Sequence, residues 1–156
     1  MRPSGFVDPG GSVPRTAVEE DLLEVARAVM RISLQAADET GGVSVVQLRA
    51  LTVLHREGAA NLAQLAEGMG VTVSTTSRLV DRLVAAGLVD RRTAEHDRRE
   101  ISLRLTSRGD TLLEHYDDRR LALLRECLDA LPNDKRETAL SGLRVFGDAA
   151  STGATA

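Results

Sequence analysis

Hydroxyl and guanidinium side chains are concentrated in one short stretch of the chain, which comprises Thr72, Ser74, Thr75, Ser77, Arg78 and Arg82. Hydroxyls at the start of a helix can bind phosphates and base edges of a duplex, and Thr72 is also placed to cap that helix. Arg78 is the predicted base contact, because a guanidinium binds a guanine edge through two hydrogen bonds, worth roughly 1–3 kcal/mol of discrimination. Arg82, one turn later, is the predicted phosphate contact. The alternative is that both arginines only solvate the helix and pair with Asp81 and other acidic residues.

A second group of charged side chains lies between two short apolar segments. Arg98 and Arg99 suit a narrow, A·T-rich minor groove, whose enhanced negative potential attracts an inserted arginine. Asp97 on its own would repel phosphate, so we predict that it braces an arginine or caps the turn. Three further arginines are Arg91, Arg92 and Arg104. They are predicted to reach flanking phosphates, with a solvated surface as the alternative.

The hydroxyl-rich stretch has the pattern of two helices joined by a tight turn. Asn61, followed three residues later by Gln64, predicts a capping box at the start of a short helix, which Gly68 and Gly70 are predicted to end. A second helix is expected over residues 71–86. Its predicted buried face is formed by Val71, Leu79, Val80 and Leu83. Two such helices form a helix-turn-helix, whose second helix lies in the major groove of DNA.

A β-hairpin is predicted directly after this second helix. Gly87 is expected to stop the helix, because a residue without Cβ adopts the left-handed cap conformation cheaply. Residues 88–92 form a predicted strand and residues 93–98 a polar loop, and the apolar alternation in residues 101–105 predicts the returning strand. A helix-turn-helix followed by such a hairpin is a winged helix, with the hairpin as its wing.

The hairpin resembles the signature of the MarR (multiple antibiotic resistance regulator) family, in the sequence L-V-D-R-R-T-A-E-H-D-R-R-E-I-S-L-R-L-T-S-R-G. The family pattern is an L-V-x-R strand, a D-x-R wing tip and a closing L-T-x-x-G, and the resemblance covers roughly residues 48–113 by motif. By this resemblance Asp97 and Arg99 match the D-x-R pair, and Arg99 is the expected groove contact. The resemblance also implies a homodimer held by terminal helices, and repression that a small ligand relieves.

The expected architecture is mainly α, a winged helix-turn-helix of order α-α-α-α-β-β-α-α with terminal helices that form a dimerisation region. The helix after the wing is expected to begin at the N-cap Thr106 and to stop at Pro132, and a last helix is expected over residues 133–146. The predicted parts of the chain are a flexible lead (residues 1–15), a single domain (16–147) and a flexible tail (148–156). The single domain is predicted to contain a DNA-binding lobe (44–106) and dimerisation helices (16–40 and 107–147).

Apolar stripes on the first helix and the last two predict contacts with a second copy of the chain. A stripe as wide as that of the first helix needs more than one partner surface. The residues predicted to form the dimer are Val18, Leu22, Val25, Val29, Leu128, Leu131, Leu140 and Leu143. A two-fold axis would then present two recognition helices to a pseudo-palindromic duplex, with half-sites about one helical turn apart.

A ligand site is predicted from the family resemblance, in which small, often aromatic or phenolic effectors bind between the dimer helices and the DNA-binding lobe. The candidate lining residues are Met30, Arg31, His55, Tyr116 and Arg120. A guanidinium beside apolar walls suits an organic acid. The alternatives are a core or boundary role for His55 and ion pairs for the arginines.

Charge is unevenly distributed along the chain, whose net charge is −3. Residues 44–109 contain ten Arg against seven Asp plus Glu, a net of +3, and the remainder has ten basic against sixteen acidic residues, a net of −6. A basic module on an acidic scaffold concentrates the attraction for phosphate. Aromatic residues amount to only 2%, which argues against the stacking platforms that bind single strands.

Other functional classes have little support in the sequence. It contains no Cys-His or His-x-x-x-His cluster and no Gly-rich phosphate loop after a strand, so no enzyme, metal or cofactor is predicted. No apolar run approaches the ~18 residues of a membrane span, which favours a cytoplasmic protein. Cys127, the only cysteine, falls at helical spacing with Leu123 and Leu131 and is predicted to be a small buried side chain, not a redox sensor.

The main alternative function is a winged helix that contacts a protein instead of a duplex. It predicts weak binding to any DNA at low salt. It also predicts that Arg78, Arg98 and Arg99 tolerate replacement by alanine.

Overall fold

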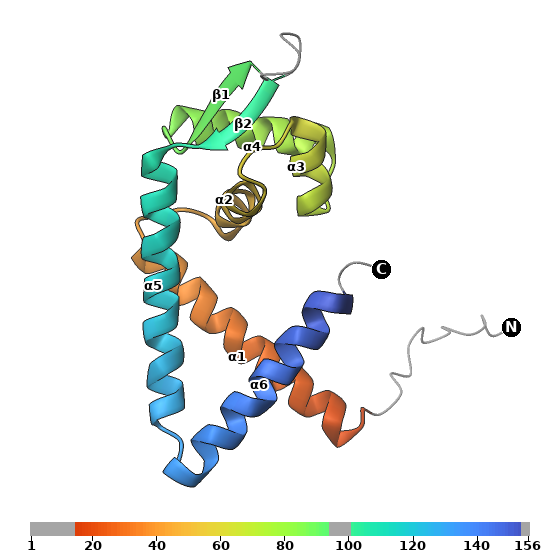
Figure 1. Ribbon diagram of the computed structural model, residues 1–156, viewed down its shortest axis with the longest axis vertical. Coiled ribbons are helices and arrows are strands. Elements are labelled where there is room, and N and C mark those ends of the chain that lie inside the picture. The colour runs from red at the N-terminus through yellow and green to blue at the C-terminus, as the bar shows by residue number, and fades with distance from the viewer. Residues whose placement is uncertain (1–14, 94–100, 154–156) are drawn as a thin grey trace, which may run out of the picture. The chain divides into compact units, whose positions relative to one another are not determined.

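The computed structural model describes residues 15–93 and 101–153, which form six helices and one two-stranded antiparallel sheet (Figure 1). The elements are α1 (Ala17–Glu39), α2 (Val45–Glu57), α3 (Leu62–Met69), α4 (Val73–Ala85), β1 (Val89–Thr93), β2 (Ile101–Leu105), α5 (Ser107–Asp129) and α6 (Asn133–Gly153). This order confirms the predicted fold class, a mainly α winged helix-turn-helix.

The chain divides into two compact units, Met1–Arg31 and Ile32–Ala156, and α1 spans the division. In the first unit the Thr16 amide donates a hydrogen bond to the Glu19 carboxylate over 2.7 Å, and the Glu19 amide donates to the Thr16 hydroxyl. The bond from the Thr16 amide lowers the pKa of Glu19 from its ordinary value of 4.5. α1 therefore begins with a capping box.

The predicted boundaries of the lobe and of the dimerisation helices stay predictions.

The helices of the second unit begin where side chains can cap them. The N-caps are Ser44 for α2, Asn61 for α3, Thr72 for α4 and Thr106 for α5. Each accepts a hydrogen bond from the amide three residues on, which satisfies one of the free amides at a helix start. Gly70 ends α3 in the left-handed conformation at φ 66°, and Gly87 follows α4 at φ 70°. The predicted caps Asn61, Thr72 and Thr106 are confirmed.

Two predictions about the helix-turn-helix were wrong. Gly68 does not end α3, which continues to Met69; a Cβ on Gly68 would lie 2.8 Å from Cγ1 of Val53, so glycine here allows α3 to pack closely on α2. Val71 is not buried but lies in the turn before α4, with its side chain 40% exposed. Thr76 takes the remaining place on the buried face, where its hydroxyl donates to the Thr72 carbonyl over 3.0 Å.

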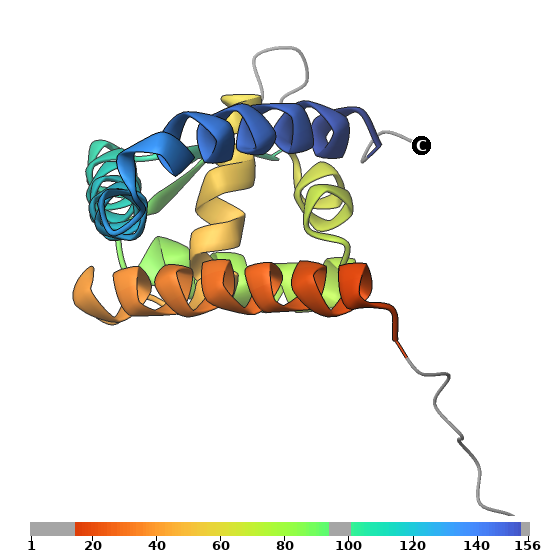
Figure 2. The same ribbon diagram turned by 90° about the horizontal axis from the view of Figure 1, so that it is seen from below.

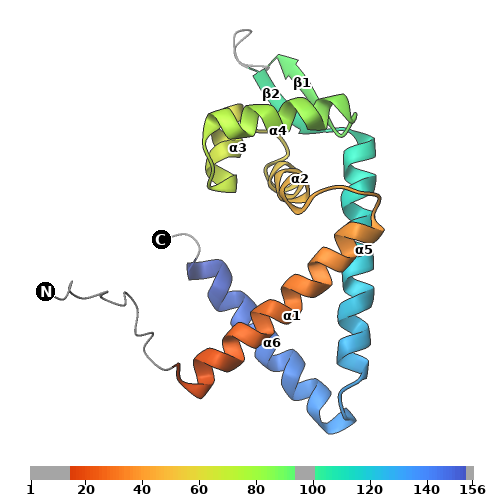
Figure 3. The same cartoon turned by 180° about the vertical axis from the view of Figure 1, so that it is seen from behind.

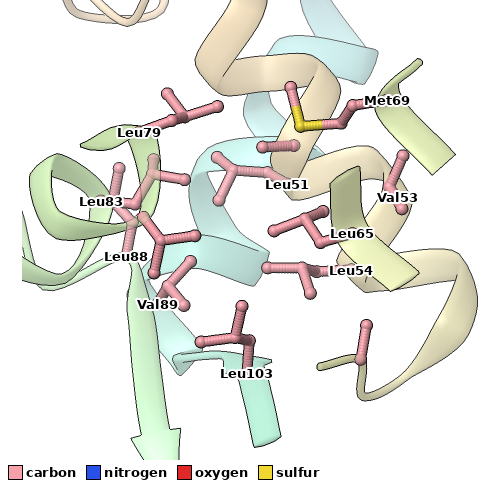
Figure 4. Close-up of a cluster of buried hydrophobic side chains, with 13 residues drawn as sticks. Leu51, Val53, Leu54, Leu65, Met69, Leu79, Leu83, Leu88, Val89 and Leu103 are labelled. Atoms are coloured by element: carbon pink, nitrogen blue, oxygen red, sulfur yellow. The ribbon is translucent and has the colours of Figure 1, made fainter. Parts of the chain in front are cut away.

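The larger hydrophobic core lies between α2, α3, α4 and the hairpin (Figure 4). Its largest fully buried apolar side chains are Leu51, Leu54, Leu65, Val80, Leu83, Val89 and Leu103. Burying one such side chain contributes roughly 1.5–3 kcal/mol. This core therefore holds one face of α4 and leaves the opposite face to solvent.

A smaller core joins the end of α1, α2 and α5. Its buried residues are Ala36, Ala37, Leu48, Leu113, Tyr116 and Leu123. α2 lies between α3 and α5 and contacts both, so it links the two cores (Figure 2). On the surface beside this core, Arg119 of α5 pairs with Glu39 at the end of α1 and, together with Gln35, lowers the pKa of the Glu39 carboxyl.

Cys127 in α5 and the end of α6 differ from the predictions, whereas α6 begins at Asn133 as predicted. Cys127 is exposed, contrary to the predicted burial, because the buried face of α5 ends one turn earlier at Leu123. α6 continues to Gly153 instead of ending near Phe146. No described side chain of α6 is buried, and Leu143 and Phe146 are 58% and 62% exposed.

The wing strands pair in antiparallel register from Val89–Leu105 to Thr93–Ile101. Leu103 of β2 also forms a bridge with Ala60, in the loop between α2 and α3, through two backbone hydrogen bonds of 3.1 and 2.8 Å. The base of the wing is thus hydrogen-bonded to the helix-turn-helix, and the Leu103 side chain enters the larger core.

The end of α4 is tied to the start of α5 through Gly87, Leu88, Thr106 and Gly109, which we call the α4–α5 joint (Figure 3). The Thr106 hydroxyl donates to the Gly87 carbonyl over 2.7 Å, and the Thr106 amide donates to the Leu88 carbonyl over 3.1 Å. A Cβ on Gly109 would lie 2.2 Å from the same Leu88 oxygen. Only glycine permits this approach.

Replacing Gly109 with alanine should lower the free energy of unfolding by about 1–3 kcal/mol, because the backbone must shift to relieve the overlap with Leu88. Urea unfolding followed by circular dichroism measures this change. Gly142→Ala in α6 is the matched control, since a Cβ there meets nothing within 4 Å. The control should be neutral or stabilising by up to about 1 kcal/mol. Equal stabilities of the two variants would contradict the close approach.

Candidate nucleic-acid interface

The exposed face of α4 carries the predicted contact arginines. Arg78 and Arg82 are exposed, and neither pairs with an acidic side chain in the described part of the chain. Asp81, the carboxylate between them in the sequence, pairs instead with Arg91 on β1. Two guanidiniums therefore project from α4 without a neutralising partner among residues 15–93 and 101–153.

The Asp81–Arg91 ion pair joins α4 to the wing. Asp81 and Arg91 are 59% and 40% exposed, and a surface pair of this kind contributes at most about 1 kcal/mol. Its main effect is to turn the Arg91 side chain toward α4. Arg92 pairs with Asp90 on the same strand over 2.9 Å, and Arg104 is exposed. The predicted phosphate contact of Arg91 stays a prediction, but its guanidinium is already partly engaged.

The hydroxyls at the start of α4 bind one another. The Thr72 hydroxyl lies 3.1 Å from that of Ser74 and 2.9 Å from that of Thr75, and it accepts the Thr75 amide over 3.3 Å. We call Thr72, Ser74 and Thr75 the hydroxyl cluster. Ser77, one turn further on, is half-buried. The structure brings the predicted polar residues of the hydroxyl cluster together, and the Thr72 hydroxyl uses its hydrogen-bonding capacity to cap and order the helix start.

The wing tip lies outside the residues that the structure describes. The predicted minor-groove residues Arg98 and Arg99, and the predicted brace Asp97, are in this segment. Their roles stay predictions.

The predicted ligand residues occupy different environments. Tyr116 is buried in the smaller core, whereas His55 is 61% exposed and lies 3.4 Å from Asp110. Arg120 has a buried Nε atom with no hydrogen-bond partner in the part of the chain that the structure describes. In the first unit, Met30 is 55% exposed and Arg31 pairs with Glu24 over 3.8 Å. A hollow of about 420 Å³ beside Thr40, Arg108 and His115 contains none of the five predicted ligand residues.

Most of the predicted dimer residues are exposed in the single chain. Val18, Leu22 and Val25 of α1 are 68%, 52% and 56% exposed. Leu128 and Leu131 are half-buried, and Val29, Leu140 and Leu143 are exposed. These residues form apolar faces on separate helices, and their contact with a second copy stays a prediction.

Two other kinds of feature are absent from the described residues. Among them, no three His, Cys, Asp or Glu side chains are grouped as metal ligands would be. No described helix has the length and apolarity needed to cross a membrane.

Three features of this surface were not predicted from the sequence. Val73, the first residue of α4, is 49% exposed, Thr76 is buried, and the carboxylate of Asp81 is bound by the wing. The helical period alone could have placed Thr76 beside Val80 on the buried face. The Asp81–Arg91 pair joins two separate elements, and no pattern within either one predicts it.

The comparison with known proteins identifies one family. A family model described as "MarR family" matches residues 43–101. The HTH-type transcriptional repressor MdtR of Bacillus subtilis is 32% identical over 114 residues, which cover 73% of this chain and 74% of MdtR. The crystal structure of RV1404 from Mycobacterium tuberculosis superimposes with a TM-score of 0.78 at 29% identity, over 90% of this chain and 98% of that one. A mutant of S. aureus MepR bound to an oligodeoxyribonucleotide shares the fold, with a TM-score of 0.69 at 16% identity over 86% and 99% of the two chains.

Replacing Thr72 with alanine should lower the free energy of unfolding by about 1 kcal/mol, because the helix start loses its cap and the hydroxyl cluster its centre. Thr72→Ser keeps the oxygen and should retain most of that stability. Thr111→Ala, at an exposed position within α5, is the control and should be neutral or stabilising by up to about 0.7 kcal/mol, because alanine has the higher helix propensity. Urea denaturation compares the three variants. If Thr72→Ala proves as stable as wild type, the Thr72 hydroxyl does not stabilise the start of α4, which contradicts the prediction.

Proposed function

Because this chain belongs to the MarR family, we propose that it is a transcriptional regulator that binds a specific sequence of double-stranded DNA as a homodimer. In this proposal α4 enters the major groove and the wing reaches toward the adjacent minor groove. A duplex in the cytoplasm is the partner, and repression is the favoured outcome, since the relative MdtR is named a repressor.

The observation that carries the proposal is the pair of guanidiniums on α4 that no described acidic side chain neutralises. The larger core holds the helix by Leu79, Val80 and Leu83, so the side with Arg78 and Arg82 is available to a ligand. An arginine suits both a guanine edge and a phosphate. Arg78 is assigned to a base edge. Arg82, one helical turn after Arg78, is assigned to a phosphate of the DNA backbone.

Dimerisation is supported by the apolar faces of α1 and α6. Large apolar side chains such as Val18, Leu22, Leu143 and Phe146 are more than half exposed in the single chain. An apolar helix face left open to water marks an interaction site, and a two-fold dimer would cover each such face on both copies. Two recognition helices would then contact two half-sites.

Relief of repression by a small organic acid is the remaining part of the proposal. The buried Nε of Arg120 supports it, because an unpaired buried donor is costly and a ligand oxygen could satisfy it. An effector acts only if it binds the DNA-incompetent dimer more tightly than the DNA-competent one.

Selection of duplexes from a randomised pool, followed by titration at several salt concentrations, tests DNA binding. Arg78→Ala should relax the preference for one guanine, with a discrimination loss of roughly 1–3 kcal/mol. Arg82→Ala should weaken selected and scrambled duplexes alike and reduce the slope of log K against log salt by about 0.9 per lost phosphate contact.

The control for these two variants is Arg125→Ala, which removes the same charge from an exposed position on α5. It should leave both the preference and the salt slope unchanged. Failure of the wild-type chain to prefer any duplex would favour the protein-contact alternative.

Replacing Leu143 with glutamate should shift the chain from dimer to monomer, because a carboxylate would be buried against an apolar partner surface. Light scattering after size exclusion measures the mass. Ser141→Glu adds the same charge to the same exposed helix and should leave the dimer intact. A wild-type monomer at micromolar concentration would refute the dimer directly.

A further inference from the structure

We propose that Val73, with Val71 beside it, contacts thymine 5-methyl groups in the major groove, so that the start of α4 selects thymine by apolar contact. This inference rests on the proposed function, because it names the bases that the same surface would select. We call Val71 and Val73 the valine pair.

The first observation is that the hydrogen-bonding capacity of the Thr72 hydroxyl, at the start of α4, is occupied. The Thr72 hydroxyl has contacts with the Ser74 hydroxyl, the Thr75 hydroxyl and the Thr75 amide, all within 3.3 Å. A hydroxyl engaged in this way offers little discrimination among base edges. Apolar groups beside Thr72 are therefore candidates for distinguishing bases at the helix start.

The second observation is the exposure of the valine pair. The large apolar side chains Leu79, Val80 and Leu83 of α4 are at most 2% exposed, yet Val73 is 49% and Val71 40% exposed. In the first turn of α4 it is Thr76 that is fully buried, whereas Val73 is left exposed. The two valines therefore flank the capped end of the helix as an apolar surface beside the hydroxyl cluster.

The chemistry of the major groove supplies a matching partner. Thymine presents a 5-methyl group there, and apolar side chains are the groups that contact it. The N-terminal residues of a recognition helix are the ones that approach base edges, and Val73 is the first residue of α4. A β-branched side chain is stiff at χ1, so its methyls keep one position and can discriminate. Arg78, five residues further along α4 and unpaired among the described residues, would contact a neighbouring guanine.

Uracil substitution isolates the methyl group. Each thymine of the selected duplex is replaced singly by uracil, which keeps the base pair and removes only the 5-methyl. Wild-type protein should lose affinity about fourfold for each contacted methyl, the equivalent of roughly 0.8 kcal/mol. Val73→Ala should bind the thymine duplex more weakly than wild type, and uracil at the same position should then cause no further loss.

A matched control is Val46→Ala, which shortens a valine of similar exposure, 53%, in the first turn of α2. It should retain the full wild-type response to uracil. Val73→Thr keeps the shape but replaces one methyl by hydroxyl, and it should respond to uracil less than wild type does. Circular dichroism confirms that each variant is folded.

The outcomes separate this inference from the proposed function. Sequence-specific binding that no uracil substitution weakens would overturn the thymine contact and leave the DNA-binding function standing. The same conclusion would follow if Val73→Ala and Val71→Ala both lost affinity on uracil substitution as much as wild type does. Absence of preference for any duplex would overturn both.

Discussion

The burial of one face of α4 is the constraint on which the rest of the structure depends. Leu79, Val80, Leu83 and the fully buried Thr76 pack against α2, α3 and the base of the wing, and this packing decides which side of the helix reaches solvent. This packing sets the positions of the exposed guanidiniums, the hydroxyl cluster and the valine pair. A change in core packing would rotate all of them together. The positions of the side chains on the exposed face of α4 therefore depend on the packing of the larger core.

Two kinds of interaction hold the surroundings of α4 in place. Backbone hydrogen bonds connect the wing to the loop before α3 through Ala60 and Leu103, and the α4–α5 joint connects the other end of the helix to α5. Side-chain pairs such as Asp81–Arg91 lie on the surface, where water screens them. The backbone contacts set the geometry, and the surface pairs adjust the direction of individual side chains.

Local patterns predicted the fold well because the signals that start and stop its helices are local. Asn61, Thr72 and Thr106 cap helices with their own side chains, and Gly70 and Gly87 end them by conformation. The predictions were wrong where the burial of a side chain depends on residues that are distant in the sequence. Helical spacing suggested that Val71 and Cys127 are buried, but one lies in a turn and the other beyond the last buried residue of α5. The sequence likewise located the hydroxyls without revealing that they bind one another.

The length of α5 gives the α4–α5 joint a mechanical consequence. A helix of 23 residues is about 35 Å long, since each residue adds about 1.5 Å. With the recognition helix secured at one end, α5 is a lever arm whose far end leads into α6. A tilt of about 10° would swing α4 by about 6 Å, nearly two base-pair steps of about 3.4 Å. Small angular changes at the base of this lever are enough to move α4 out of register with a groove.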